Sequence, residues 1–251
     1  MTNLRTLLDK LRRPKPAAAK PDKFANYPDF GAELRQTIER IQPYTMSSPE
    51  RMVAMYEAAR HVSRHKLPGA IVECGVWKGG SMMLAAIGLL SAGERNRPLY
   101  LFDTYEGMTA PTDADRSPLF APTAAELLSR SEKSARIWAV SALDEVRSNL
   151  ASTGYPMETM KFIKGPVEET VPAQAPEQIA LLRLDTDWYE STRHEMMHLY
   201  PRLVPGGILI IDDYGHWEGA RKAVDEYITQ NNLRLFLNRI DYTGRLAIKP
   251  S

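Results

Sequence analysis

The chain has 251 residues, of which 43% are hydrophobic and 25% charged, and its formal net charge is +1. This length suits one α/β domain with a full core and is too short for two large domains. The balanced charge gives no global sign of nucleic-acid or membrane binding. The single cysteine, Cys74, excludes an internal disulfide and suits a reducing compartment. No apolar run reaches the roughly 20 residues needed to cross a bilayer, so we expect a cytoplasmic protein without a transmembrane segment.

The first 23 residues differ in charge from the rest of the chain. They contain seven basic and two acidic side chains, and prolines at positions 14, 16 and 21 stop any helix that begins in the leucine-rich start. We predict a basic N-terminal tail over residues 1–23 and one domain over residues 24–251. A basic helix in the tail would suit an acidic lipid surface or a partner. A mobile tail or a dimer-contact arm is the simpler interpretation.

Strand and helix patterns alternate through the rest of the chain and predict a mostly parallel sheet with helices on both faces. Residues 30–41 have helical periodicity, and Ser48-Pro49-Glu50 is typical of the start of a helix that runs to about Arg64. The apolar runs 70–74 and 99–103, with a helix over 82–90 between them, form a right-handed βαβ unit. We further predict helices over 140–150, 191–203 and 219–230, a strand over 160–164, two strands that end at Leu184 and Ile211, and an antiparallel edge pair over 233–238 and 245–248.

Residues 107–134 form the least regular segment, with several prolines in the first half. A loop of this length inside a compact domain is usually functional or disordered. Because it follows the strand that ends in Asp103, we interpret residues 107–140 as a lid over the active site. A floppy insertion is the alternative.

The turn Glu73-Cys74-Gly75-Val76-Trp77-Lys78-Gly79-Gly80-Ser81 joins the first predicted strand to its helix. Glycines at such a place let a cofactor approach backbone N–H groups at a helix N-terminus. Because Glu73 precedes the first glycine, its carboxylate would repel a pyrophosphate and suit an ammonium group or a hydroxyl. Asp103, at the end of the next strand, suits the two hydroxyls of a ribose. Together they predict a nucleoside cofactor that carries an amino acid, although packing and capping roles remain the alternatives.

Two later apolar strands each end in a pair of carboxylates, Asp185 with Asp187 and Asp212 with Asp213. The carboxyl ends of parallel strands form the ligand crevice of an open α/β sheet, so we expect these acids to converge. Adjacent carboxylates repel one another unless a cation or a proton intervenes, and an oxygen-rich site suits Mg²⁺. An acidic loop that only caps the next helix is the alternative.

The histidines carry less information. His61 with His65, and His194 with His198, lie four residues apart, but neither pair has a further nitrogen or sulfur ligand in range, so we prefer solvated helix faces to a zinc site. His216 follows Asp213 closely and is either a substrate contact or, more simply, a loop residue without a catalytic role.

Five motifs in order over about residues 30–248 resemble the macrocin O-methyltransferase family. They are Thr45-Met46-Ser47-Ser48-Pro49-Glu50-Arg51, the glycine turn with Val72 and Glu73, Asp103-Thr104-Tyr105-Glu106-Gly107, Asp185-x-Asp187-x-Tyr189-Glu190-Ser191-Thr192, and Asp212-Asp213-Tyr214-Gly215. The resemblance implies the Rossmann-like fold of class I methyltransferases, which depend on S-adenosylmethionine (SAM), with a seven-stranded sheet. It also implies a Mg²⁺-dependent enzyme that methylates sugar hydroxyls of antibiotics and related glycosides, and a homodimer in which N-terminal helices lie near the active site.

The same resemblance assigns roles to individual residues. It implies Mg²⁺ at Asp185, Asp212 and Asp213, and Asp187 as the general base. Some members are thought to use a lid histidine as base, but residues 107–140 contain none, which favours Asp187. The implied SAM-binding residues are Thr45, Met46, Glu73, Gly75, Trp77, Ser81, Asp103, Tyr105, Glu106, Ser141, Gly165 and Pro166.

The leading hypothesis is therefore a SAM- and Mg²⁺-dependent O-methyltransferase that acts on a vicinal diol of a glycoside. A metal-dependent glycosyltransferase that uses the Asp185-x-Asp187 pair is one alternative, against which the glycine turn with Glu73 argues. An inactive scaffold with the same fold is the other.

Overall fold

The computed structural model describes residues 23–119 and 122–250, and it divides into two units, residues 1–36 and 37–251. In the described part of the first unit, the rings of Tyr27 and Phe30 stack with centroids 4.7 Å apart. Arg35 Nε donates a hydrogen bond to the carbonyl of Phe30 at 2.7 Å. The predicted basic tail over residues 1–23 lies almost wholly outside the described residues.

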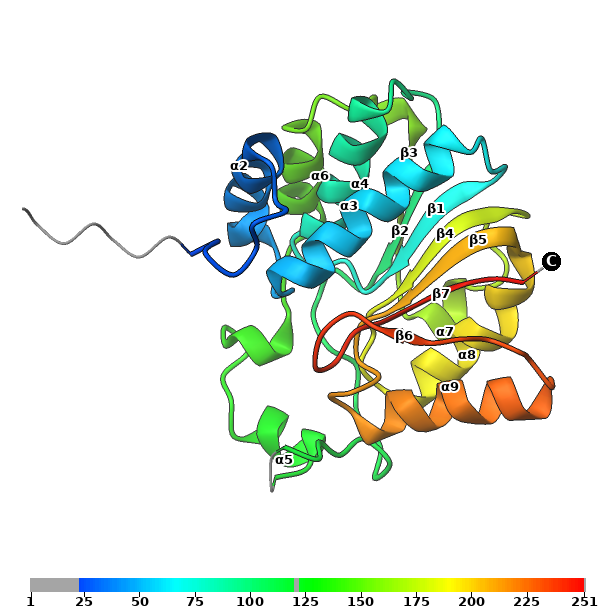
Figure 1. Cartoon of the computed structure of the whole chain (residues 1–251). Helices are drawn as coiled ribbons and strands as arrows, with labels where there is room; N and C mark the ends of the chain where they lie inside the picture. Colours follow the sequence, from blue (N-terminus) through cyan, green and yellow to red (C-terminus); the bar gives the residue numbers. More distant parts are fainter. Residues whose placement is uncertain (1–22, 120–121, 251) are drawn as a thin grey trace, which may run out of the picture. The chain divides into compact units, whose positions relative to one another are not determined.

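The second unit contains a seven-stranded sheet in the order β3-β2-β1-β4-β5-β7-β6 (Figure 1). Strands β1 to β5 pair in parallel, and β7 is antiparallel to both of its neighbours. This confirms the mostly parallel sheet with an antiparallel edge strand. The strands are β1 (Ala70–Cys74), β2 (Leu99–Asp103), β3 (Met160–Lys164), β4 (Ile179–Leu184), β5 (Leu203–Ile211), β6 (Asn238–Arg239) and β7 (Arg245–Ile248).

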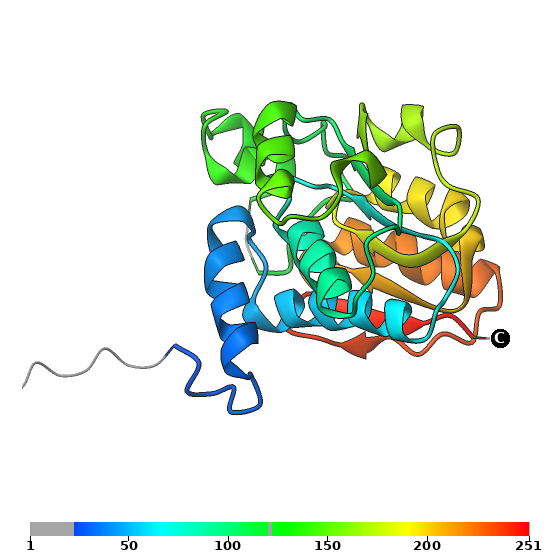
Figure 2. The ribbon, with the colours of Figure 1, turned by 90° about the horizontal axis from the view of Figure 1, so that it is seen from above.

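Helices cover both faces of this sheet (Figures 1 and 2). One layer holds α3 (Pro49–Arg64), α4 (Gly80–Ser91) and α6 (Leu143–Ala151), and the other holds α7 (Val167–Thr170), α8 (Tyr189–His198) and α9 (Glu218–Gln230). Two further helices are α2 (Ala32–Ile41) and α5 (Ala124–Ser129). The central strands β1 and β4 are buried at every position, because helices pack against both of their faces.

Local sequence explains where the helices begin. The side chain of Ser48 accepts a hydrogen bond from the backbone N–H of Arg51, and Pro49 occupies the first position of α3. Helix α5 begins with a reciprocal capping box between Thr123 and Glu126. The Thr-x-x-Glu pattern was a readable signal for this helix, which our interpretation of an irregular segment missed.

Two predicted elements are shorter in the structure than expected. Helix α8 ends at His198, and residues 200–202 form a 3₁₀ turn, because Pro201 has no N–H to continue the α-helix. Strand β6 covers only Asn238–Arg239 instead of residues 233–238. The alternating leucines at 233, 235 and 237 produced that prediction, and they pack against the core without joining the sheet.

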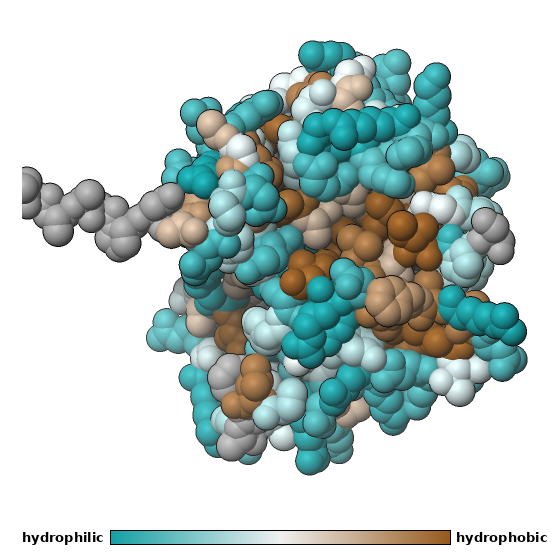
Figure 3. All heavy atoms as spheres, in the orientation of Figure 1, coloured by the Kyte–Doolittle hydropathy of each residue, from teal (hydrophilic) through white to brown (hydrophobic). Residues whose placement is uncertain are grey.

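Figure 3 shows apolar side chains gathered on the viewed face of the molecule, between α3 and α9. Phe236 and Ile248, which lie before β6 and at the end of β7, are among the exposed large hydrophobic residues. Among the described residues, no helix has the length and apolar character that a membrane span needs.

Candidate active site

A cavity of about 410 Å³ lies at the carboxyl ends of β1, β2, β4 and β5. This is where an open parallel sheet places its ligand crevice, and the volume is in the range typical of small-molecule sites. Most of the predicted site residues line it. They are Thr45, Met46, Gly75, Trp77, Ser81, Asp103, Gly165, Pro166, Asp185, Asp187, Asp212 and Asp213.

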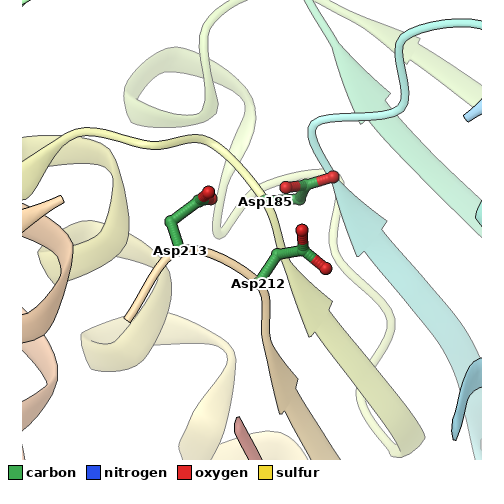
Figure 4. Close-up of side chains that lie close together, drawn as sticks. All are labelled: Asp185, Asp212 and Asp213. Carbon is green, nitrogen blue, oxygen red and sulfur yellow. The ribbon is translucent and has the colours of Figure 1, made fainter. Parts of the chain in front are cut away.

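The acid corner of the cavity is formed by Asp185, Asp187, Asp212 and Asp213, which follow β4 and β5. One carboxylate oxygen from each of Asp185, Asp212 and Asp213 lies within 4.8 Å of the others. Figure 4 shows these three side chains directed toward a common space. The structure therefore brings together the carboxylates that the sequence placed on two separate strand ends.

Asp213 is the member of this corner whose charge is least compensated. Its Oδ2 atom is buried and accepts no hydrogen bond from the described part of the chain. Burial raises the pKa of the Asp213 carboxyl well above its ordinary value, and the charges of Asp187 and Asp212 raise it further. A buried carboxylate oxygen without a partner is costly unless a proton or a cation satisfies it.

Two arginines neutralise part of the acid corner. Arg183 is buried on β4, and its guanidinium donates to Asp185 Oδ2 at 2.6 Å and to Asp212 Oδ1 at 2.5 Å. Arg51, in the first turn of α3, donates to Asp212 Oδ2, and its Nε donates to Asp241 Oδ2 at 2.9 Å. The sequence analysis gave neither arginine a role. The readable signal for Arg183 was a charged residue inside an otherwise apolar strand, two positions before Asp185 and therefore on the same face.

Asp187 lies at the edge of the acid corner with a left-handed backbone, φ +67°. Its Oδ1 accepts a hydrogen bond from Trp217 Nε1 at 2.7 Å. Burial raises the pKa of Asp187 to about 7, and the charge of Asp185 adds to the rise. A carboxylate with a pKa near the working pH suits a general base. Sequence reasoning missed Trp217, which precedes α9 and orients this carboxylate.

The glycine corner is formed by residues 75–80 and Asp103, and Gly75, Val76, Trp77, Gly80 and Asp103 line the same cavity. Asp103 Oδ2 accepts hydrogen bonds from the backbone N–H groups of Val76 at 2.6 Å and Trp77 at 2.9 Å. Its Oδ1 accepts from the N–H of Tyr105 at 2.7 Å. Asp103 therefore holds the turn in place, and its predicted contact with a ribose remains a prediction.

Gly75 joins the two corners. Its φ is +81°, and a Cβ atom on it would lie 1.9 Å from the carbonyl oxygen of Asp185. A side chain there would collide with rigid backbone, so only glycine allows the turn after β1 to touch the loop after β4. The glycine at this position thus serves close packing, and its role in cofactor access stays a prediction.

Four predicted cofactor residues do not line the cavity. Glu73 is fully buried beneath it, because it is the register partner of Arg183 on β4 and binds Arg183 Nη1 through Oε1 at 2.6 Å. Its Oε2 has no hydrogen-bond partner among the described residues, and the expected contact of Glu73 with a cofactor ammonium group stays a prediction. The others bond elsewhere: Tyr105 to the carbonyl of Leu101, Glu106 to Lys164, and Ser141 to Glu145.

The predicted lid contributes one wall of the cavity. Gly107, Met108, Thr109, Leu127, Arg136, Ile137 and Ala139 line it. Helix α5 packs through Ala124 and Leu128 against Trp188 and Trp217, whose rings meet edge to face with centroids 5.1 Å apart. This aromatic pair connects the segment to the acid corner. Opening and closing of the segment stays a prediction.

The histidines differ in their relation to the site. His216 lines the cavity, and its Nδ1 lies 3.2 Å from the hydroxyl of Tyr242. The rings of His61, on α3, and His65, at its C-cap, are tilted against each other with centroids 4.3 Å apart, and His194 bonds the carbonyl of Val171.

Comparisons with known proteins agree with this architecture. The family model for macrocin O-methyltransferase (TylF) matches residues 6–247, so the matched range begins earlier than residue 30, where the sequence resemblance began, and includes most of the predicted tail. A mycinamicin III 3''-O-methyltransferase from Micromonospora griseorubida is 32% identical over 218 residues, which are 86% of this chain and 83% of the relative. An 8-demethyl-8-(2,3-dimethoxy-α-L-rhamnosyl)-tetracenomycin-C 4'-O-methyltransferase from Streptomyces olivaceus is 32% identical over 80% of this chain and 74% of the relative.

Solved structures give the same result. The O-methyltransferase NovP is 29% identical and has a TM-score of 0.71, with 83% of each chain covered. The calicheamicin methyltransferase CalS11, at 19% identity and a TM-score of 0.61 over 87% of this chain and 93% of that chain, shows the likeness of fold alone. The prediction of a class I methyltransferase fold is confirmed, and the glycosyltransferase alternative is set aside. The chain belongs to the macrocin O-methyltransferase family of SAM-dependent O-methyltransferases.

Proposed function

We propose that this enzyme transfers the methyl group of SAM to a sugar hydroxyl of a natural-product glycoside, with Mg²⁺ held by Asp185, Asp212 and Asp213. The observation that carries the proposal is the unpartnered, buried Oδ2 of Asp213 in a cluster of three carboxylates, inside the cavity that also contains the glycine corner. The relatives support the substrate class, since their names describe methylation of tetracenomycin and mycinamicin glycosides.

The donor set fits a hard divalent cation. Carboxylate oxygens are the ligands that Mg²⁺ prefers, and Mg²⁺ keeps further positions for water or substrate. The two arginines leave the corner short of positive charge, because Arg51 and Arg183 face four cavity carboxylates as well as the buried Glu73 and Asp241. When bound, the metal supplies an electrostatic site that orients neighbouring hydroxyls and lowers the pKa of one of them.

The glycine corner suits the adenosine and amino-acid parts of SAM. The turn before α4 is fixed by Asp103, which accepts hydrogen bonds from the N–H groups of Val76 and Trp77, and the cavity wall there includes Trp77 and Gly165. Thr45 and Met46, ahead of α3, also line the cavity, and Thr45 lies next to Gly80 of the glycine corner. In this proposal SAM binds beside the glycine corner with its methyl group toward the acid corner, and the predicted SAM contacts that line the cavity are assigned to this region.

Asp187 is the general base in this proposal. Its carboxylate lines the cavity, is oriented by Trp217 and has a raised pKa of about 7 because it is buried. It takes the proton of the acceptor hydroxyl as the oxygen attacks the sulfonium methyl carbon. The O–CH₃ bond forms, the C–S bond breaks, and the electron pair of that bond stays on sulfur, which leaves neutral S-adenosylhomocysteine (SAH).

Two measurements test this function. The first is calorimetric titration of the enzyme with SAH and, in a parallel cell, with a uridine diphosphate sugar; the proposal requires SAH to bind and the sugar nucleotide to give no heat of binding. The second is transfer of a tritiated methyl group from SAM to a panel of rhamnosides and other deoxysugar glycosides, before and after dialysis against EDTA. Activity should vanish with EDTA and return with Mg²⁺. Unchanged turnover in EDTA would refute the metal site, and no transfer to any glycoside would refute the acceptor class.

A further inference from the structure

Arg183 makes contacts in the acid corner that the proposed function does not use. Its side chain is 3% exposed, and it lies on β4 between Glu73 of β1 and the carboxylates that follow β4 and β5. Nη1 donates to Glu73 Oε1 and to Asp185 Oδ2, both at 2.6 Å. Nη2 donates to Asp212 Oδ1 at 2.5 Å and to Ser47 Oγ at 3.3 Å. The planar guanidinium group is thus fixed by hydrogen bonds from both of its terminal nitrogens and has little freedom to rotate.

These bonds occupy one oxygen of each of two proposed metal ligands. Asp185 keeps Oδ1, which accepts no hydrogen bond from the residues that the structure describes, and Asp212 keeps Oδ2. Asp213 offers the buried, unpartnered Oδ2. Asp185 therefore presents Oδ1 to a cation, and Asp212 can present Oδ2 once Arg51 releases it. A second oxygen from either residue is available only if its hydrogen bond to Arg183 breaks.

Arg51 contacts the remaining oxygen of Asp212 but is held differently. It lines the cavity, whereas Arg183 is buried behind it. Its Nε also bonds Asp241 Oδ2, at 2.9 Å, and Asp241 in turn accepts from Ser48 Oγ at 2.7 Å. Arg51 can release Asp212 Oδ2 to a cation and stay paired with Asp241. Arg183 has less room to move away from Asp185 and Asp212, because it is buried and its guanidinium is also bonded to Glu73 and Ser47.

The number of oxygens that each carboxylate offers separates the two common hard cations. Ca²⁺ takes six to eight oxygens and often uses both oxygens of a carboxylate, while Mg²⁺ requires a near-octahedral arrangement of six and retains waters. We propose that Arg183 is a positioning residue that makes the site selective for Mg²⁺ over Ca²⁺, by restricting Asp185 and Asp212 to one metal-facing oxygen each. This inference rests on the proposed function, since it concerns the same metal site.

The test compares two arginine-to-lysine substitutions on the same carboxylate. Dissociation constants for Mg²⁺ and Ca²⁺ are measured by calorimetry on the full chain with SAH present and no acceptor, for the wild type, Arg183→Lys and Arg51→Lys. A lysine at position 183 keeps the charge but cannot hold both carboxylates in a fork, so the ratio of Ca²⁺ to Mg²⁺ affinity should rise about tenfold or more. Arg51→Lys is the matched control, and its ratio should stay within about twofold of the wild type because Arg183 still restricts Asp212.

Loss of folding would lower the affinity for both cations and leave the ratio uninformative, so a second measurement uses the wild type alone. A crystal structure with Mn²⁺ should show Asp185 and Asp212 each binding through one oxygen, with Arg183 still on the other. Two-oxygen binding by either residue overturns the inference, as does an unchanged ratio in Arg183→Lys that still binds SAH. If the wild type binds neither Mg²⁺ nor Mn²⁺, the proposed metal-dependent function itself fails, and the two failures are thereby distinguished.

Discussion

The acid corner and the glycine corner both place aspartates at the carboxyl ends of parallel strands, but they satisfy them in opposite ways. Asp103 has three backbone N–H donors on its two oxygens, so its charge is compensated by the chain itself. Asp213 has a buried oxygen with no partner among the described residues. The chain itself therefore satisfies Asp103, whereas the buried oxygen of Asp213 requires a proton or a cation.

This difference shows that position at a strand end is not sufficient to assign a role. Asp103, which was expected to bind the hydroxyls of a ribose, fixes the turn after β1, because the backbone N–H groups of Val76 and Trp77 point at its carboxylate. Burial raises the pKa of Asp103, but its hydrogen bonds oppose the rise. In Asp213, burial and like charges act in the same direction. The unsatisfied group is the better guide to a ligand site.

The largest effect should come from Asp187→Asn. The substitution keeps the shape of the side chain and a hydrogen-bond acceptor for Trp217, but removes the base, so turnover should fall about a thousandfold. The affinity for SAH should change little, because the proposed SAM contacts lie in the glycine corner and Asp187 lies in the acid corner. Steady-state rates of methyl transfer together with SAH calorimetry measure both quantities. A rate within tenfold of the wild type would show that another group takes the proton.

The pH profile sharpens the same prediction. A base must be deprotonated to act, and the pKa of Asp187 is raised to about 7 by burial. The rate in the wild type should therefore rise with pH and level off above about pH 7, with a lower midpoint when Mg²⁺ is saturating because the cation favours the carboxylate. The residual activity of Asp187→Asn should lack this limb. A wild-type profile that is flat from pH 5 to 8 would contradict the assignment.

Asp213→Asn should lower turnover about a hundredfold at fixed Mg²⁺ by weakening the metal site. Part of the loss should be recovered at high Mg²⁺, and SAH affinity should stay close to that of the wild type. The matched variant in the other corner is Asp103→Asn, which replaces one acceptor oxygen by an NH₂ group that faces backbone donors. It should weaken SAH binding about tenfold and destabilise the fold by roughly 1–3 kcal/mol, with unchanged affinity for Mg²⁺. If each variant weakened the binding of both SAH and Mg²⁺ equally, the two corners would not bind different ligands.

The smallest effect concerns a buried acid that lies outside the cavity. Glu195 on α8 is fully buried, accepts a hydrogen bond from Thr186 at 2.9 Å and has a pKa raised to about 8 by burial. Since its pKa is raised in the folded state, its contribution to stability is fully present below about pH 4.5 and is lost as pH rises through about 8. Glu195→Gln should therefore match the wild type near pH 4.5 and exceed it in free energy of unfolding by roughly 4 kcal/mol at pH 8. Urea unfolding at several pH values measures this, and equal stability of the two proteins at pH 8 would show that Glu195 is not neutral in the fold.

The sequence by itself determined the strands, most of the helices and the acids of the site, because apolar runs, proline and capping residues act over a few neighbouring positions. β1, β2 and β3 have the predicted bounds, and the carboxylates after β4 and β5 converge because parallel strands end at the same edge. Only the tertiary structure decided which oxygen of each acid is free. The register of β1 against β4 places Glu73 under Arg183, and residues far apart in the chain, such as Arg51 and Asp241, complete the charge balance. Such pairings depend on register and helix packing, to which no local pattern in the sequence corresponds.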